Sequence, residues 1–185
     1  GNVVGWDVRV GVPVMTLSGH NAHLWGVGYS PTGELMVSYG ADGTARLWNA
    51  DDGGLVHVLR GHEYEINGAR FSPDGRQLVT ASADRSVRLW DTRSGQQLAR
   101  LDGHEAAVRS AEFDASGRRI VSASDDGTAR VWDASTGKAL LVLRGLGAPG
   151  ASYPSLTQRF PAAQMFEREL WEQTGLQPAG HPWCK

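Results

Sequence analysis

Hydrophobic and polar positions alternate in short segments along most of the chain, and glycine, proline, aspartate and serine separate these segments. A period of two over short segments is typical of β-strands with one buried face. In the middle of the chain this pattern predicts strands at residues 66–71, 77–82, 86–90 and 97–101. Turn residues lie at each reversal, so consecutive strands are expected to pair antiparallel. The pattern therefore predicts a four-stranded antiparallel sheet.

The same arrangement repeats along the chain with a period of 42 residues. Gly-His pairs, turn glycines, aspartates and tryptophans all keep this step. They are Gly19-His20, Gly61-His62, Gly103-His104, Gly33, Gly75, Gly117, Asp42, Asp84, Asp126, Trp48, Trp90 and Trp132, with Trp6 one period before Trp48. Because several markers share one register, each unit is expected to be one supersecondary element of a repeat array.

Gly-His near one end of each unit and Trp-Asp near the other resemble the motifs of WD40 repeats. The matching pairs are Gly61-His62, Trp90-Asp91, Gly103-His104 and Trp132-Asp133. The first unit departs from the pattern in one residue, since Trp48 is followed by Asn49. The resemblance covers roughly residues 1–145. It implies an all-β fold made of four-stranded WD40 β-propeller blades, and a role in binding other proteins.

The resemblance also implies an incomplete ring, because WD40 propellers usually have about seven blades. We expect a partial blade with its third and outer strands, three complete blades, and a linker with a C-terminal tail. Their ranges are 1–18, 19–60, 61–102, 103–144 and 145–185. Pro161 is expected to open a short helix at about 162–173. The tail resembles the ends of bacterial WD40 chains and the sequence lacks an initial Met, so we expect the C-terminal part of a longer bacterial-type WD40 protein.

Composition and charge narrow the range of partners. The chain has 185 residues, of which 41% are hydrophobic, and a formal net charge of −2. This charge does not favour a nucleic-acid partner, and the chain has no apolar run of roughly eighteen residues that could span a membrane. The single cysteine, Cys184, cannot form an internal disulfide, and no secretory signal is recognisable. We therefore expect a cytoplasmic protein with no cofactor and no metal.

The resemblance further implies a buried network of Asp, His, Ser or Thr, and Trp in each blade. These residue types complement one another as hydrogen-bond donors and acceptors, and an unmet buried group costs roughly 1–3 kcal/mol. The expected members are His20, Ser38, Asp42 and Trp48 in the first blade; His62, Thr80 or Ser82, Asp84 and Trp90 in the second; and His104, Ser122 or Ser124, Asp126 and Trp132 in the third.

Hydroxyl, imidazole and carboxylate are also the ingredients of a catalytic triad, which makes a hydrolase a third alternative. The set occurs three times at one period and includes Trp, which has no role in nucleophilic catalysis. We therefore interpret it as a structural lock between strands and loops. Arginines at one repeat position, Arg46, Arg88 and Arg130, are interpreted as a solvated row whose stems pack over the blades.

Positions that differ between the repeats are the candidates for partner binding, because the repeated positions serve the fold. The segment after each Gly-His pair differs most, and the resemblance places it on the top face of a propeller. Trp25, Tyr64 and Arg109 are of types enriched at interface hot spots. Asn67 shares the register of Trp25 and Arg109, and Asp125 is expected on the same side. We predict that these five residues bind another protein or a peptide, although Trp25 and Tyr64 could instead pack on neighbouring loops.

Two main hypotheses follow for function. The first is a non-enzymatic protein-interaction scaffold or sensor domain. The second is a structural assembly unit whose open ends pair with further WD40 blades, supplied by other copies or by a missing half. Sedimentation separates the two, because a discrete oligomer favours assembly.

Overall fold

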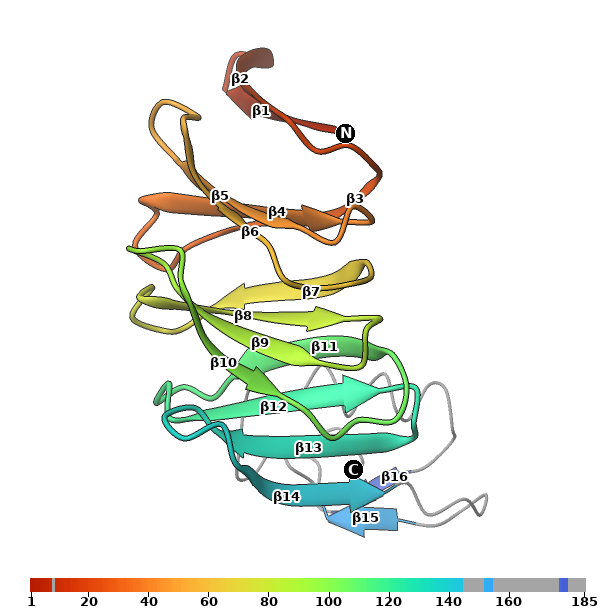
Figure 1. Cartoon of the computed structure of the whole chain (residues 1–185). Helices are drawn as coiled ribbons and strands as arrows, with labels where there is room; N and C mark the ends of the chain where they lie inside the picture. Colours follow the sequence, from red (N-terminus) through yellow and green to blue (C-terminus); the bar gives the residue numbers. More distant parts are fainter. Residues whose placement is uncertain (8, 145–151, 155–176, 180–185) are drawn as a thin grey trace.

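The computed structural model describes residues 1–7, 9–144, 152–154 and 177–179, and the side chains of residues 1–7 and 9–144. Residues 1–7 and 9–144 form an open stack of antiparallel sheets (Figure 1). The blades are β3 Leu24–Tyr29, β4 Leu35–Gly40, β5 Ala45–Asn49 and β6 Leu55–Leu59; β7 Ile66–Phe71, β8 Gln77–Ser82, β9 Val87–Asp91 and β10 Gln97–Leu101; and β11 Val108–Phe113, β12 Arg119–Ser124, β13 Thr128–Asp133 and β14 Ala139–Arg144. The predicted all-β fold of four-stranded blades in an incomplete ring is confirmed.

Each blade is a meander in which the strands pair in chain order. Its first reversal, between β7 and β8 in the second blade, is a tight turn closed by the Gly75 amide on the Ser72 carbonyl at 2.9 Å. Gly75 has a φ of 72°, a left-handed conformation that glycine adopts without steric cost. Gly33 and Gly117 do the same one period away, with φ values of 76° and 69°. The repeated turn glycines of the sequence are therefore explained by backbone geometry.

The hydrophobic core lies between neighbouring blades. Between the first and second blades, Val37, Leu47 and Leu59 pack with Ile66 and Leu78. The same positions recur between the second and third blades, which enclose another cluster of buried side chains. Burying one such aliphatic side chain stabilises a fold by about 1.5–3 kcal/mol. Each blade therefore depends on its neighbours for stability, as in other repeat arrays.

A two-stranded sheet lies at the N-terminal end of the stack, consisting of β1 Asn2–Asp7 and β2 Val12–Ser18 (Figure 1). It packs on the first blade through Leu17, which contacts Met36 and Trp48. This sheet is the partial blade that the sequence predicts. It lies at the opposite end of the stack from β11–β14.

In the C-terminal region the structure describes only residues 152–154 and 177–179 beyond residue 144. Two short segments, β15 Ser152–Pro154 and β16 Gln177–Ala179, pair in parallel, and the sequence pattern did not predict them. Three-residue strands are too short for a period of two to be recognised. The helix expected at about 162–173 lies outside the described residues.

Candidate functional site

A chain of hydrogen bonds connects four side chains inside the second blade. The Trp90 indole N–H donates to Thr80 Oγ1 at 2.9 Å, and this oxygen lies 2.8 Å from His62 Nε2. On the other side of the ring, His62 Nδ1 lies 2.7 Å from Asp84 Oδ2. The imidazole therefore joins the loop before β7 to strand β8 and to the turn that follows β8.

The same arrangement occurs in the first and third blades. The imidazole–carboxylate distances are 2.8 Å for His20 and Asp42 and 2.9 Å for His104 and Asp126. The imidazole–hydroxyl distances are 2.8 Å for His20 and Ser38 and 2.7 Å for His104 and Ser122. The indoles of Trp48 and Trp132 donate to Ser38 and Ser122, both at 2.8 Å. All three blades thus contain one network, which we call the tetrad.

One proton arrangement satisfies every member of the tetrad. The carboxylate only accepts, so the imidazole donates through Nδ1–H. Nε2 then accepts the hydroxyl proton, while the hydroxyl oxygen accepts the indole N–H. This arrangement requires a neutral imidazole. Burial lowers the pKa of His62 and outweighs the opposing effect of Asp84, and burial likewise lowers the pKa of His20 and His104.

The carboxylates of the tetrad are held ionised. Burial alone would raise the pKa of Asp42, but hydrogen bonds from the side chain and amide of Thr44, and from His20, lower it to about 2. Burial would also raise the pKa of Asp84 and Asp126, but their hydrogen bonds outweigh it and lower each pKa further than that of Asp42. Each Asp also accepts a loop amide, as Asp84 does from the Glu63 N–H at 3.2 Å.

In the second and third blades, the sequence left open which of two hydroxyls belongs to the tetrad, and the structure distinguishes them. Thr80 and Ser122 belong to the tetrads. Ser82 instead donates to the Glu65 carbonyl at 2.8 Å, and Ser124 donates to the Ala106 carbonyl at 3.1 Å. These two residues therefore fix the loop that precedes the first strand of their blade.

Sequence reasoning missed a further hydroxyl in each tetrad. Ser86 donates to Asp84 Oδ1 at 2.7 Å, and Thr44 and Thr128 donate to their own aspartates at 2.7 and 2.6 Å. The signal was present, because a hydroxyl recurs two residues after each repeated Asp. These hydroxyls lower the pKa of the aspartates and close the turn after β4, β8 and β12.

The tetrad has the connectivity of a catalytic triad but lacks its accessibility. Side chains of Ser38 and Thr80 are 0% exposed and that of Ser122 is 1% exposed. Each hydroxyl is also fixed between an indole and an imidazole. A substrate carbonyl therefore has no approach to these oxygens.

The arginine row is not solvated as predicted, because Arg46 and Arg88 are buried. The guanidinium of Arg88 reaches Gln97, and that of Arg130 lies 5.9 Å from the ring centroid of Trp132. A Cβ on Gly61 would lie 2.5 Å from Nη1 of Arg88, so a side chain there would displace the buried guanidinium. Because the glycine of the Gly-His pair has no side chain, the guanidinium can lie close to the backbone at this position.

The loops that follow the Gly-His pairs and the turns after β4, β8 and β12 lie at one end of the strands. Backbone hydrogen bonds join them, for example from the Ala83 N–H to the Glu65 carbonyl at 3.0 Å. We call this end the top face; it consists of loops 19–23, 61–65 and 103–107, turns 41–44, 83–86 and 125–127, and the first two residues of β3, β7 and β11.

The predicted partner-binding residues occupy the top face in different ways. Trp25 and Tyr64 are exposed, and the Trp25 indole donates to Glu65 of the next blade at 3.2 Å. Arg109 and Asp125 form a two-pronged ion pair with a shortest distance of 2.6 Å. Asn67 is half-buried and donates to the Val108 carbonyl at 2.9 Å, so it connects neighbouring blades.

Arg85 is a top-face residue that sequence reasoning missed. It is exposed and has a φ of 72°, a left-handed conformation that is costly for a side chain with a Cβ. Glycines occupy the same position in the other units, with φ values of 70° for Gly43 and 74° for Gly127. The signal was a non-glycine residue at a repeat position where two units carry glycine.

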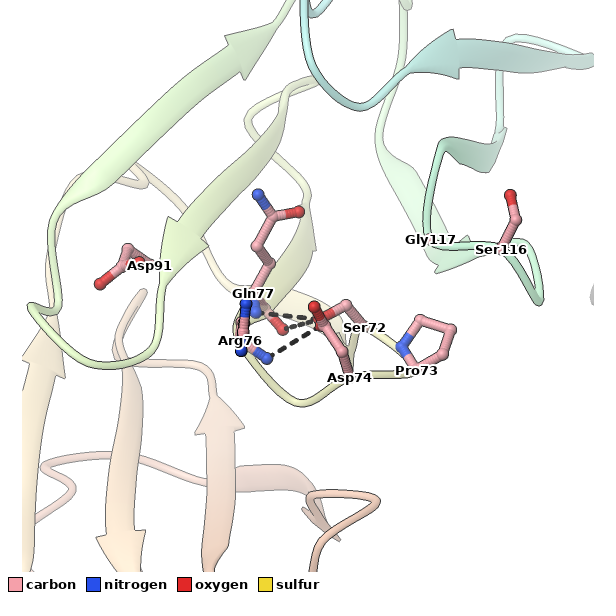
Figure 2. A pocket seen from close by; sticks show the side chains of 8 residues that line it. All are labelled: Ser72, Pro73, Asp74, Arg76, Gln77, Asp91, Ser116 and Gly117. Carbon is pink, nitrogen blue, oxygen red and sulfur yellow. Dashed lines mark hydrogen bonds between the residues drawn. The ribbon is translucent and has the colours of Figure 1, made fainter.

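A pocket of about 350 Å³ lies at the other end of the strands. Figure 2 shows the turn from Ser72 to Gln77 on one side of it and Ser116 and Gly117 on the other. Within the turn on one side, Ser72 Oγ donates to Asp74 at 2.6 Å and the Arg76 N–H donates to the same carboxylate at 3.1 Å. The hydrogen bond from Ser72 also lowers the pKa of Asp74. Ser72 and Asp74 are therefore already paired with each other within the turn.

Two absences concern only the part of the chain that the structure describes. No group of three or more His, Cys, Asp and Glu side chains is placed to hold a metal ion there. Nor do these residues include a helix with the length and hydrophobicity needed to cross a membrane.

Replacing Thr80 by Val tests the tetrad. The change keeps the shape but leaves the Trp90 N–H and the His62 Nε2 buried without partners, so we expect the free energy of unfolding to fall by about 2–5 kcal/mol. Thr80→Ser is the matched control, because Ser fills this position in the other blades; it should cost about 1 kcal/mol for the lost methyl. Denaturant unfolding measures both, and equal effects of the two changes would contradict the assignment.

Acidification should destabilise the protein in two steps. The tetrad histidines have pKa values below the ordinary 6.5, so the unfolded chain binds more protons and stability falls as the pH drops from about 7.5 to 5. The three residues together allow a slope of at most about 4 kcal/mol per pH unit. A second loss follows below pH 3.8, as the pH approaches the pKa of about 2 for Asp42.

Urea unfolding across the pH range measures both steps of this loss. Repeating the series in high salt is the control, because salt screens exposed charges far more than the buried tetrads. A free energy of unfolding that stays constant between pH 7.5 and 5 would contradict the neutral, buried imidazoles.

Known protein families match two parts of the chain. A model described as "WD domain, G-beta repeat" matches residues 11–49, 53–91 and 95–133, and each match ends at the residue after a tetrad tryptophan. A model described as "Respiratory-chain NADH dehydrogenase, 30 Kd subunit" matches residues 136–185. Most of that second segment lies outside the described residues.

Three relatives match a short stretch of the chain. Over 44 residues the chain is 50% identical to "Nuclear distribution protein PAC1" of Arthroderma otae, and 46% identical to proteins of the same name from Arthroderma benhamiae and Trichophyton verrucosum. The stretch covers 24% of this chain and 10% of each relative, so the match spans about a tenth of the length of those proteins. Since the first family model matches more than half of the residues, and the blades and tetrads follow its repeats, the chain belongs to the WD40 repeat family.

Proposed function

We propose that the chain is a non-enzymatic scaffold that binds another protein or a peptide through its top face. WD40 domains generally mediate protein–protein interactions. The observation that carries the proposal is the exposure of two large aromatic side chains, 55% for Trp25 and 64% for Tyr64. Both stand where the repeats differ, and aromatic residues supply much of the binding energy at protein interfaces.

The other top-face residues supply polar contacts around these aromatics. Arg109 and Asp125 hold each other in a fixed orientation and still expose about half of their side chains, 51% and 44%. Asn67 serves as a positioning residue, because its side-chain amide donates to the Val108 carbonyl at the start of β11 in the neighbouring blade. An aromatic centre with a polar rim is the usual anatomy of a protein interface.

The proposal includes the absence of enzymatic activity and a cytoplasmic location. Support for the first comes from the tetrads, whose hydroxyls are fully buried. The single cysteine supports the second, because a fold without internal disulfides suits a reducing compartment. A net charge of −2 favours neither nucleic acid nor an anionic membrane as partner.

Trp25→Ala and Arg109→Ala test the top face. We expect each change to weaken partner binding by at least about tenfold, as expected for a hot-spot residue. The melting temperature should stay nearly constant, because exposed ion pairs and hydrogen bonds contribute about 1 kcal/mol or less. The partner would first be identified by proximity labelling, and its affinity then measured for each variant.

Arg76→Ala, at the opposite end of the strands, is the matched control and should leave this binding unchanged. A large loss of stability with binding intact would exclude a role of Trp25 and Arg109 in recognition.

Arg85→Gly is expected to separate stability from binding. Glycine relieves the left-handed backbone strain, so the free energy of unfolding should rise by about 0.5–1 kcal/mol. Binding should weaken several-fold, because an exposed guanidinium leaves the top face. Denaturant unfolding and an affinity titration measure the two effects. Unchanged binding would remove Arg85 from the proposed interface, and a fall in stability would contradict the strain.

A further inference from the structure

An irregularity recurs in the outer strand of each complete blade. The pairing of β5 with β6 shifts its register at Trp48 and leaves Val56 without a cross-strand partner. The pairs β9–β10 and β13–β14 shift at the same place and leave Leu98 and Leu140 unpaired. Each shift inserts one extra residue, a β-bulge, and a bulge turns side chains out of the regular ladder. The outer edge of each complete blade therefore carries one re-aimed side chain.

The three re-aimed side chains are aliphatic and exposed. Val56 is 41% exposed, Leu98 50% and Leu140 53%, and none of them belongs to a hydrophobic core cluster of the described residues. Strand β10 lies between β6 and β14 in the stack, so the exposure of Leu98 does not depend on either end of the chain (Figure 1). We call Val56, Leu98 and Leu140 the rim row.

The fold does not account for aliphatic side chains in the rim row. A bulge at a sheet edge protects that edge from pairing with another chain, and charged side chains serve the same purpose. Three exposed aliphatic side chains at matching positions instead keep apolar surface in water, which is unfavourable. Apolar residues that line up on neighbouring elements are typical of an interaction surface, whereas single exposed ones are common on any protein.

The rim row runs across the strands. Its members lie on β6, β10 and β14, which follow one another down the stack (Figure 1). A strand added to one of these edges would run along it and contact a single member, and the bulge interrupts the ladder that it needs. A segment that contacts all three members has to satisfy its own backbone hydrogen bonds, as an α-helix does. Facing sheets lie about 10 Å apart, so this helix needs at least about 14 residues.

Positive charge exceeds negative charge beside the rim row. Within four residues of its members the sequence has four cations and two carboxylates, which are Arg60, Arg100, Lys138, Arg144, Asp52 and Asp102. Asp102 pairs with Arg100 at 2.8 Å. Asp52 accepts the Gly54 N–H at 2.7 Å, so both carboxylates already have a partner. Because the whole chain has a formal net charge of −2, this excess of cations is local, and an acidic segment complements it.

We propose that the rim row is the docking surface for an acidic amphipathic helix of a partner protein. The helix lies across β6, β10 and β14, places its apolar face on the rim row and directs acidic side chains toward the flanking cations. This surface is separate from the top face, because it consists of outer strands and contains none of the top-face loops. A second copy of the chain that docked rim to rim would bring like charges together.

A stapled peptide tests the docking surface, because the staple removes the cost of ordering a helix. The peptide has about 28 residues in four heptads, with Leu at the two apolar positions and Glu at the flanking positions. We expect saturable binding to the full chain in a fluorescence anisotropy titration. Leu98→Thr should weaken this binding at least about fivefold, because Thr suits a strand but loses most of the apolar contact. The melting temperature should stay nearly constant, since the position is exposed.

A second peptide with Lys in place of every Glu tests the charge complementarity. We expect it to bind at least about tenfold more weakly than the acidic peptide. Lys138→Glu in the full chain should reduce this difference, because it removes one cation beside Leu140 and adds a carboxylate. Equal affinities of the two peptides for the unchanged chain would overturn an acidic partner.

Tyr64→Ala on the top face is the control for the peptide titration. It should leave peptide binding unchanged, so failure of this proposal and failure of the proposed top-face function are distinguishable. Absence of peptide binding would overturn the docking surface. A large fall in the melting temperature of the Leu98→Thr chain with peptide binding intact would assign the rim row to the fold and overturn it as well.

Anionic vesicles test the other surface that aliphatic and cationic side chains suit. The rim row lacks the aromatic residues that often anchor a protein in a membrane interface, so we expect no sedimentation of the chain with vesicles of phosphatidylserine and phosphatidylcholine. Sedimentation that Leu98→Thr abolishes would overturn a partner helix and assign the rim row to a membrane surface.

Discussion

The need of buried polar groups for hydrogen-bond partners determines most of this structure. Each blade encloses an indole, a hydroxyl, an imidazole and a carboxylate, and each of these satisfies the next. A missing member would leave its neighbours buried and unpaired, at a cost of about 1–3 kcal/mol each. The tetrad therefore fixes the loop, the second strand and the turn of a blade in one arrangement. The top face is built on the segments that the tetrad holds.

The proposed function and the fold use different positions of the same repeat. Residues that recur at the period of 42 lie in the tetrads, the turns and the cores between blades. Trp25, Tyr64 and Arg85 interrupt that period and are exposed. Because the tetrads hold the loops rigidly, these side chains can vary without cost to the core. The proposed binding surface would therefore lose little conformational entropy on association.

Much of the fold could be predicted from the sequence because strand alternation and turn glycines are local signals. The middle blade was predicted to within one residue at each strand, β9 being displaced by one. The choice between Thr80 and Ser82 could not be made, because residues two apart on a strand lie on the same face. Burial of Arg46 and Arg88 depends on a contact with glycines far away in sequence, which no local pattern reports. The same holds for Arg109 and Asp125, which were predicted as separate candidates and form an ion pair.

The hydrogen bonds that cross between blades have a mechanical consequence. Trp25 reaches Glu65 of the second blade, and Asn67 reaches Val108 of the third. In a linear array, the contacts between neighbouring units determine how cooperatively the units unfold. A partner seated over these crossing points would act as a brace across the array. Binding would then slow the opening of the whole stack, including blades that the ligand does not contact.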